Sequence, residues 1–288
     1  MHTIDLLLHT VWLRPYVFLF MAAFLAMAVP AWGWRRTLLY AVMGYALAWA
    51  AEYGHTVGFP FGKYEYVSAP TLDKELWVAG VPFFDSLSFV FLCFAGLQMA
   101  RLALEPMARG PRGPWDLRWA DPARPIGWRT WALGGLLTMG MDVVIDPVAL
   151  QGDRWFLGGI YTYPNGGPHF GVPLSNYGGW ALLALAIIGT LLVVDRWFLR
   201  GWPFRSAERK GRGDWRGYPA DAVVGAGLFI GVLIFNLAIT FAIGETVMGL
   251  ASCAVTVLLV GPALVRVART VWHPKAAKGI DGIGDLVT

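Results

Sequence analysis

Long apolar stretches alternate with short polar segments along this chain. A helix needs roughly 20 apolar residues to cross the hydrocarbon core of a bilayer, and seven stretches approach that length. They predict transmembrane helices near residues 15–32, 36–54, 80–102, 130–149, 178–198, 220–243 and 246–268. We therefore expect an all-α, polytopic membrane helical bundle of about seven transmembrane helices, built as a single domain over residues 1–288.

The composition agrees with a membrane protein. The chain is 57% hydrophobic and 15% charged, whereas a soluble domain is about 45–50% apolar and about 25% charged. Cys93 and Cys253 both lie within apolar stretches, which excludes a disulfide framework and a thiolate metal site. The N-terminal residues lack the basic region and the cleavage site of a signal peptide, so we expect the first apolar stretch to remain as a span.

The distribution of basic residues predicts an orientation. Arginine and lysine concentrate in segments 35–36, 101–129, 196–216 and 266–278. Basic loops stay on the cytoplasmic side of a membrane, so we expect the N-terminus outside and the C-terminus inside, with residues 269–288 as a cytoplasmic tail. This distribution also accounts for the basic isoelectric point, and no nucleic-acid partner is needed to explain it.

Two polar loops on the predicted outer side resemble each other. Residues 54–79 contain GKYEY and lead into GVPFFDS, while residues 151–177 contain GIYTY and end in GVPLSNY. Each copy has a carboxylate at a helix end, a Gly-x-Tyr-x-Tyr segment and a Gly-Val-Pro start to the next helix, where proline suits the first turn because its missing N–H is not needed. The pattern predicts an internal parallel repeat of helical hairpins over residues 36–102 and 130–198.

Four carboxylates stand at predicted helix ends near one level of the membrane: Glu52, Asp85, Asp142 and Asp146. Burying a carboxylate is costly, so such a group usually marks a pathway, a proton relay or a site. Asp142 and Asp146 share one helix face, and two carboxyl groups in an apolar setting tend to hold one proton between them. A single acid at a helix end is often only interfacial, but the shared depth favours one site. Acids farther out in the loops, such as Glu75, are expected to be solvated.

Aromatic and polar side chains accompany the acids in both loops. The aromatic belt of a membrane protein accounts for most of the rings, but ring faces can also stabilise a developing cation. The residues that we expect to bind substrate are Tyr64, Tyr66, Tyr161, Tyr163, Asn176, Trp180 and His55.

The sequence favours neither a metal nor a cofactor. Glu52 and His55 have the i, i+3 spacing of carboxylate-bridged two-metal sites. A complete site needs a second such pair, and the five histidines form no cluster. We therefore favour a hydrogen-bonded interfacial histidine. No glycine-rich nucleotide-binding pattern is present either.

Four segments carry a resemblance to a known family. They are AEYGHTVGFPFGKYEY, GVPFFDSLSF, MDVVIDPVALQGDRWFLGGIYTYPNGG and FGVPLSNYGGW, and the chain resembles the membrane carotenoid biosynthesis family over roughly residues 35–265. That family includes the carotenoid 1,2-hydratases, also called bisanhydrobacterioruberin or gamma-carotene hydratases. The resemblance implies a cofactor-independent hydro-lyase that adds water to the C1=C2 bond of an acyclic psi end group. It also implies a lipid-soluble carotenoid as substrate, a bacterial inner membrane and association with other enzymes of the pathway.

The residues suit this reaction. Protonating C2 of the alkene makes a tertiary cation at C1, which requires a protonated carboxylic acid, aromatic faces and a positioned water. The first candidates for the acid are Asp146 and Asp142, followed by Glu52 and Asp85. The remaining carboxylates would orient the water, together with Asn176 and a tyrosine of the second loop.

Two other functions use similar features. A carotenoid cyclase protonates the same end group but captures the cation with an internal alkene. A proton-coupled transporter or a pigment-binding protein would use the acids as a relay. The last two spans contain no lysine, which argues against a retinal protein. The polar groups crowd at one face of the membrane and not at its midplane, which argues against a transporter. Asn236, near the middle of its span, is expected to be a helix-packing contact.

Overall fold

The computed structural model describes residues 3–58, 64–67, 71–121, 124–194, 197 and 221–272. Within these residues the chain forms eight α-helices and six short strands. The helices are α1 (Thr3–Leu13), α2 (Pro15–Trp32), α3 (Trp34–Thr56), α4 (Phe83–Leu104), α5 (Trp128–Ala149), α6 (Leu174–Val193), α8 (Asp221–Ala242) and α9 (Thr246–Trp272). The strands are β1 (Glu65–Tyr66), β2 (Trp77–Val78), β3 (Val81–Pro82), β4 (Met107–Arg109), β5 (Leu117–Trp119) and β6 (Tyr161–Thr162).

The predicted all-α membrane bundle is confirmed. Among the described residues, six helices are long and apolar enough to cross a membrane: α2, α4, α5, α6, α8 and α9. The remaining predicted span, α3, forms as a helix of 23 residues, which is about 35 Å at 1.5 Å per residue. It is more polar than the others because it carries Arg36 and Glu52, and both side chains are buried within the protein.

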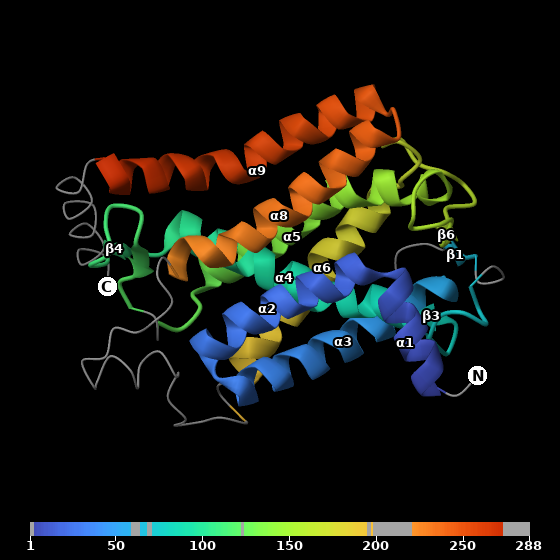
Figure 1. Ribbon diagram of the computed structural model, residues 1–288, viewed down its shortest axis with the longest axis horizontal. Helices are drawn as coiled ribbons and strands as arrows, with labels where there is room; N and C mark the ends of the chain where they lie inside the picture. Colours follow the sequence, from blue (N-terminus) through green and yellow to red (C-terminus); the bar gives the residue numbers. More distant parts are fainter. Residues whose placement is uncertain are drawn as a thin grey trace.

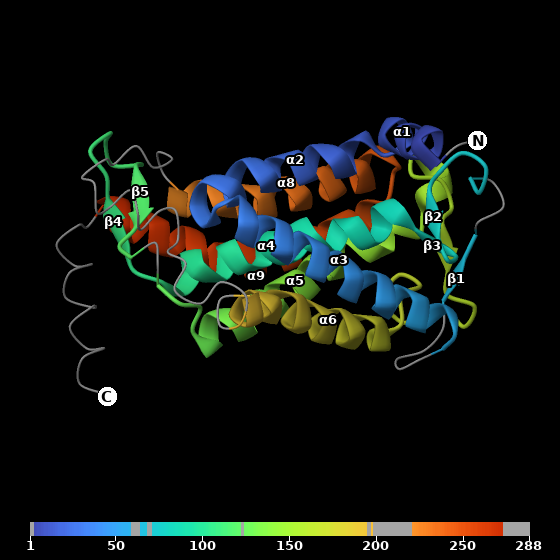
Figure 2. The same ribbon diagram turned by 90° about the horizontal axis from the view of Figure 1, so that it is seen from below.

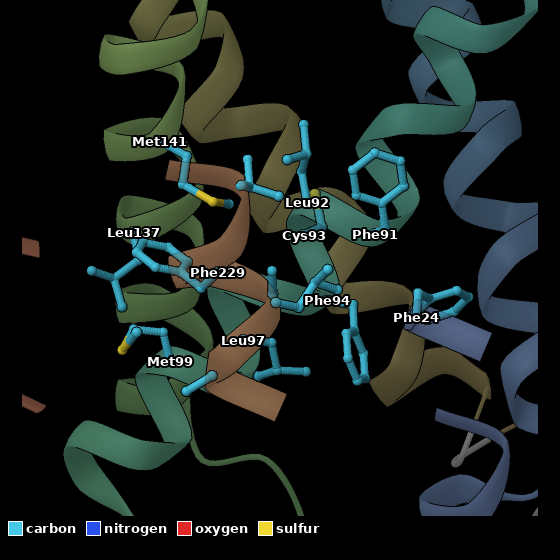
Figure 3. Close-up of a cluster of buried hydrophobic side chains, with 14 of the residues drawn as sticks. Phe24, Phe91, Leu92, Cys93, Phe94, Leu97, Met99, Leu137, Met141 and Phe229 are labelled. Carbon is cyan, nitrogen blue, oxygen red and sulfur yellow. The ribbon is translucent and has the colours of Figure 1, made fainter. Parts of the chain in front are cut away.

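Helix α4 lies in the middle of the bundle and packs against α2, α3, α5 and α8 (Figures 1 and 2). Its residues from Phe89 to Leu102 are all buried, as expected for a helix that is apolar on every side. Figure 3 shows side chains of this helix meeting Phe24 of α2, Met141 of α5 and Phe229 of α8. The core of the protein therefore surrounds α4.

Small residues bring α4 and α5 close together. A Cβ atom added at Gly96 would lie 2.1 Å from Thr138 Oγ1 and 2.8 Å from the carbonyl oxygen of Gly134. Close backbone approach at small residues is the usual way in which helices associate in membranes. The two helices run in opposite directions, so the start of α4 and the end of α5 meet at the same end of the bundle.

That end of the bundle carries β1, β2, β3 and β6 (Figures 1 and 2). Strands β1 and β6 pair antiparallel, with Glu65 opposite Thr162 and Tyr66 opposite Tyr161. The two tyrosine segments that the sequence treats as copies therefore contact each other. The internal repeat itself stays a prediction. Residues 59–63 of the first loop, much of the basic segment 196–216 and residues 273–288 of the predicted tail lie outside the described residues.

The junction of α1 and α2 anchors the polar loops. Arg14 donates to both carboxylate oxygens of Glu75, at 2.8 and 2.6 Å, and to the carbonyl oxygen of Leu157. Its guanidinium group also lies 4.5 Å from the ring centre of Phe84. The expectation that Glu75 is solvated is wrong, because its side chain is buried against a positive charge. One arginine thus connects the N-terminal helices to both loops.

Candidate active site

A cavity lies at the end of the bundle that carries the β1 and β6 loops. Its empty volume is about 880 Å³, including the space at its opening. Three of the predicted acids, Glu52, Asp85 and Asp146, line it. The other polar lining residues are Ser88, Asn176 and Asn236. The aromatic lining residues are Tyr16, Phe20, Tyr64, Phe84, Phe89, Phe91, Trp155, Tyr161, Tyr163, Trp180 and Phe235.

Tyr66 bridges two of the carboxyl groups. Its hydroxyl oxygen lies 2.6 Å from Glu52 Oε2 and 2.5 Å from Asp85 Oδ2. A hydroxyl group carries one proton, so Tyr66 donates to one carboxyl group and must accept a hydrogen bond from the other. At least one of the two acids is therefore protonated when these contacts form. We call these two acids the Glu52–Asp85 pair.

Asp146 is surrounded by hydrogen-bond donors. The hydroxyl of Tyr161 donates to Oδ1 at 2.6 Å, the hydroxyl of Tyr163 donates to Oδ2 at 2.8 Å, and the amide of Asn176 donates to Oδ2 at 2.6 Å. Several donors directed at one carboxyl group favour its ionised form. The contacts of Asp146 are thus those of a carboxylate.

Asp142 lies behind Asp146 and is fully buried. It accepts a hydrogen bond of 3.0 Å from Asn176, whose amide therefore holds both acids. Within the described part of the chain, Asp142 Oδ1 has no hydrogen-bond donor. A buried charge is costly where few donors surround it, so Asp142, with one donor, is better suited to the neutral form than Asp146, with three.

Local chain geometry explains how the acids reach the cavity. Asp85 occupies the first turn of α4, three residues after Pro82, where the positive end of the helix favours an acidic group. Asn176 occupies the corresponding turn of α6, three residues after Pro173. The first turns of these two helices thus present a carboxyl group and an amide to one cavity.

A proline shapes the end of α5. Pro147 lies inside the helix and has no N–H to donate to the carbonyl group of Val143, four residues earlier. The ring nitrogen Nε2 of His169 lies 3.1 Å from that carbonyl oxygen, so it replaces the missing donor when Nε2 carries the proton. His169 is a residue that the sequence did not single out, and it supports the helix turn that holds Asp146.

The tyrosines of the loops are hydrogen-bond donors. Burial raises the pKa of Tyr66, Tyr161 and Tyr163, and the neighbouring carboxyl groups raise each pKa further. All three hydroxyl groups therefore remain protonated near neutral pH. The ring of Tyr64 packs against all three of these rings, and its hydroxyl lies 3.3 Å from that of Tyr66. The four tyrosines thus form one cluster between the acids.

Most of the predicted site residues meet at the cavity, and three stand back from its wall. Asp142 lies behind Asn176, and Tyr66 lies behind the Glu52–Asp85 pair. His55 contacts the edge of Tyr64, with ring centres 5.3 Å apart. Among the described residues, none of these three lines the cavity, and each instead contacts a residue that does.

The sequence missed several lining residues on α2, α4 and α8. Phe89 stacks on Trp180 with ring centres 4.1 Å apart, and Tyr16 stacks on Phe235 at 5.2 Å. Asn236 also lines the cavity, although its amide donates to Val232 within its own helix. An aromatic residue in an apolar helix gives no sign of whether it faces lipid or a cavity, so no signal in the sequence separates these residues.

No metal centre is evident in the part of the chain that the structure describes. It contains no group of three or more histidine, cysteine, aspartate or glutamate residues arranged to hold a metal ion. Glu52 is instead bound to Tyr66, and His55 contacts a tyrosine ring.

The comparison with protein families gives one match. A family model described as "Carotenoid biosynthesis protein" matches residues 13–259, which include all three acids of the cavity wall and every helix from α3 to α8. No curated protein and no solved structure matches the chain with statistical significance.

Proposed function

The chain belongs to the carotenoid biosynthesis protein family, and from that premise we propose that it is a carotenoid 1,2-hydratase. It would add water to the C1=C2 double bond of an acyclic psi end group, as found in substrates of the lycopene, gamma-carotene or bisanhydrobacterioruberin type. The observation that carries this proposal is a cavity in which three carboxyl groups face a wall of aromatic rings.

The reaction requires a strong acid close to an apolar alkene. A proton added to C2 leaves a tertiary cation at C1. The carboxyl groups line the cavity together with the stacked rings of Phe89 and Trp180, and a ring face contributes about 2 kcal/mol to a desolvated cation. A water molecule then bonds to C1 and loses a proton to a carboxylate. The sum is alkene plus water giving a tertiary alcohol.

The proposed reaction balances without a cofactor. Hydration changes no overall oxidation state, and the enzyme regains from the water the proton that it gives to the alkene. The side chains of the cavity can therefore supply all the acid and base groups that the proposed mechanism uses.

The surroundings of the cavity suit a lipid-soluble substrate. Phe20 of α2 and Phe235 of α8 line it and contact each other, with ring centres 5.8 Å apart. Both helices are apolar enough to lie in a bilayer. We propose that the end group enters the cavity while the polyene remains in contact with these helices. The proposed location is a bacterial inner membrane with the N-terminus outside, where other enzymes of the pathway are candidate partners.

A carotenoid cyclase is the second candidate, because the Glu52–Asp85 pair could protonate the same end group. In a cyclase the cation reacts with an internal alkene. The polar groups around Asp146 favour hydration, since Tyr161, Tyr163 and Asn176 all line the cavity and can hold a water.

Pigment analysis separates these functions. The gene is expressed in cells that accumulate lycopene or gamma-carotene, and the pigments are analysed by mass spectrometry. Hydratase activity predicts a product heavier by one water for each end group that reacts. A cyclised isomer of unchanged mass would support the cyclase, and unchanged pigments with both substrates would contradict both proposals. Asp146→Asn is the test variant, and Asp153→Asn, at an exposed position of the same loop region, is the matched control.

A further inference from the structure

We infer that two separate carboxyl groups divide the work of hydration: the Glu52–Asp85 pair gives the proton to the alkene, and Asp146 takes the proton from the attacking water. This inference rests on the proposed function and assigns its two proton transfers. The assignment differs from the order that the sequence favours, in which Asp146 and Asp142 come first as proton donors.

The number of protons needed around Tyr66 identifies the group that donates a proton to the alkene. Tyr66 has one hydroxyl proton and two carboxyl neighbours, at 2.6 and 2.5 Å. The second short contact requires a proton on Glu52 or on Asp85. Both of these acids line the cavity, so this proton lies beside the space that the alkene would occupy.

The hydrogen bonds of Asp146 identify the acceptor. Two tyrosine hydroxyls and one amide donate to its oxygens at 2.6 to 2.8 Å. A carboxyl group held by three donors is stabilised as an anion and is a poor proton donor. Because it also lines the cavity, it can accept a hydrogen bond from the attacking water and then its proton.

The first turns of α4 and α6 explain the difference between the two sides. Each turn carries one polar residue three positions after a proline, and that residue is Asp85 in α4 and Asn176 in α6. An aspartate beside Glu52 creates an acid pair that retains a proton, since two adjacent carboxylates repel each other. An asparagine beside Asp146 donates a hydrogen bond instead and favours the ionised form. The difference between aspartate and asparagine, together with a neutral Asp142 behind Asp146, thus separates acid from base.

Asp142 and Tyr66 are positioning residues in this scheme. Neither lines the cavity among the described residues. Asp142 shares the amide of Asn176 with Asp146 and holds that amide in place. Tyr66 holds Glu52 and Asp85 on either side of one hydroxyl group.

The tyrosine cluster connects Asp146 with the Glu52–Asp85 pair, and a proton must pass between them after each reaction. Asp146 ends the reaction with a proton, and the Glu52–Asp85 pair ends it without one. The hydroxyl of Tyr64 lies 3.3 Å from that of Tyr66, and the ring of Tyr64 contacts the rings of Tyr161 and Tyr163. We assign these hydroxyl groups to the return of one proton from Asp146 to the pair. The bonds then balance: the π bond between C1 and C2 and one O–H bond of water break, while a C–H bond forms at C2 and a C–O bond forms at C1.

Deuterium uptake tests directly whether different carboxyl groups donate and accept the proton. Membranes that contain the full-length protein are incubated in D₂O with an acyclic carotenoid, and both product and recovered substrate are analysed by mass spectrometry. The wild-type product carries one carbon-bound deuterium at C2. In Asp146→Asn the cation still forms, but it returns a proton to the pair. Hydration falls by about 10²-fold or more, while the recovered substrate gains deuterium near C1 and C2.

Variants of the pair give the opposite pattern. Glu52→Gln and Asp85→Asn each leave one acid without its charged neighbour, so the shared proton is lost. Both hydration and deuterium uptake fall by about 10²-fold or more. If Asp146→Asn loses both signals while Glu52→Gln and Asp85→Asn keep deuterium uptake, the assignment is reversed and our inference fails. A wild-type protein that neither hydrates nor deuterates any acyclic carotenoid would instead overturn the proposed function.

Two tyrosine variants keep the test independent of folding. Tyr66→Phe removes the bridge between Glu52 and Asp85 and should lower hydration and deuterium uptake together. Tyr163→Phe removes one donor to Asp146 and should lower hydration more than uptake. A general loss of structure would lower both signals equally in both variants, and that outcome contradicts the inference.

Discussion

Tyr66 and Tyr161 lie opposite each other in the antiparallel pair of β1 and β6, and their hydroxyl groups bind carboxyl groups on different helices. Tyr66 contacts Glu52 of α3 and Asp85 of α4, whereas Tyr161 donates to Asp146 of α5. A short sheet at the end of a membrane bundle therefore brings three acids to one cavity.

Trp180 is expected to stabilise the cation. It lines the cavity and stacks on Phe89 with ring centres 4.1 Å apart. Trp180→Leu removes one ring face, which contributes about 2 kcal/mol, so hydration should slow about 30-fold. The rate is measured with membranes containing equal amounts of protein. Trp128→Leu changes an exposed tryptophan of α5 and should retain the wild-type rate. Equal rates for both variants would contradict the role of Trp180.

The Arg14 and Glu75 ion pair is expected to stabilise the loop end of the bundle. Both side chains are buried, at 2.8 and 2.6 Å from each other. Glu75→Gln leaves an arginine without its counter-charge, and breaking a buried pair costs about 3–5 kcal/mol. The thermal midpoint of the protein in detergent should therefore fall clearly. Asp73→Asn alters an exposed acid two residues away and should leave the midpoint unchanged. An unchanged midpoint in Glu75→Gln would show that the pair is not stabilising.

Gly96 is expected to tolerate no side chain. A Cβ atom there would lie 2.1 Å from Thr138 Oγ1, so Gly96→Ala must push α4 away from α5, at a cost of about 1–3 kcal/mol. Gly227 of α8 has no atom within 4 Å of an added Cβ. Gly227→Ala should be neutral or slightly stabilising, because alanine favours a helix over glycine. Thermal midpoints in detergent compare the two variants, and a midpoint in Gly96→Ala at or above wild type would be evidence against close packing of α4 and α5.

His169 is expected to matter more than His55. His169→Phe leaves the Val143 carbonyl without the donor that compensates for Pro147, at a cost of about 1 kcal/mol. The turn that carries Asp146 should loosen, and hydration should fall together with thermal stability. His169→Gln can still donate and should recover part of both. His55→Phe retains an aromatic ring beside Tyr64 and should keep hydration within about threefold of wild type. A stronger effect at His55 than at His169 would refute this ranking.

The sequence predicts the helices because their signal is local. Long apolar stretches locate the seven predicted spans to within about five residues, as in Pro15–Trp32, whereas they do not predict the short helix α1. The acids also meet as predicted, since Glu52 and Asp146 lie near helix ends on the same side of the bundle. The sequence does not reveal that one hydroxyl of Tyr66 binds two acids. That contact depends on how two loops pair in space, and no local pattern encodes it.

The charged residues of the loops also depend on contacts that no local sequence pattern encodes. Glu75 stands in a polar segment that is typical of a solvated loop, but its partner Arg14 comes from a distant helix junction. The lining residue Phe235 stands in an apolar helix whose lipid-facing side cannot be read from periodicity when every side is apolar. Both features arise from packing between elements that are far apart along the chain.

The source of the product's oxygen shows whether this protein adds water to a carotenoid. Purified protein in lipid is supplied with an acyclic carotenoid in H₂¹⁸O, with dissolved oxygen removed. We expect a tertiary alcohol that carries ¹⁸O at C1 and is heavier than its substrate by one labelled water. Its amount should fall by about 10²-fold or more when Asp146→Asn replaces the wild type. A cyclised product of unchanged mass, or no product from the wild-type protein under these conditions, would contradict the claim that this protein hydrates carotenoids.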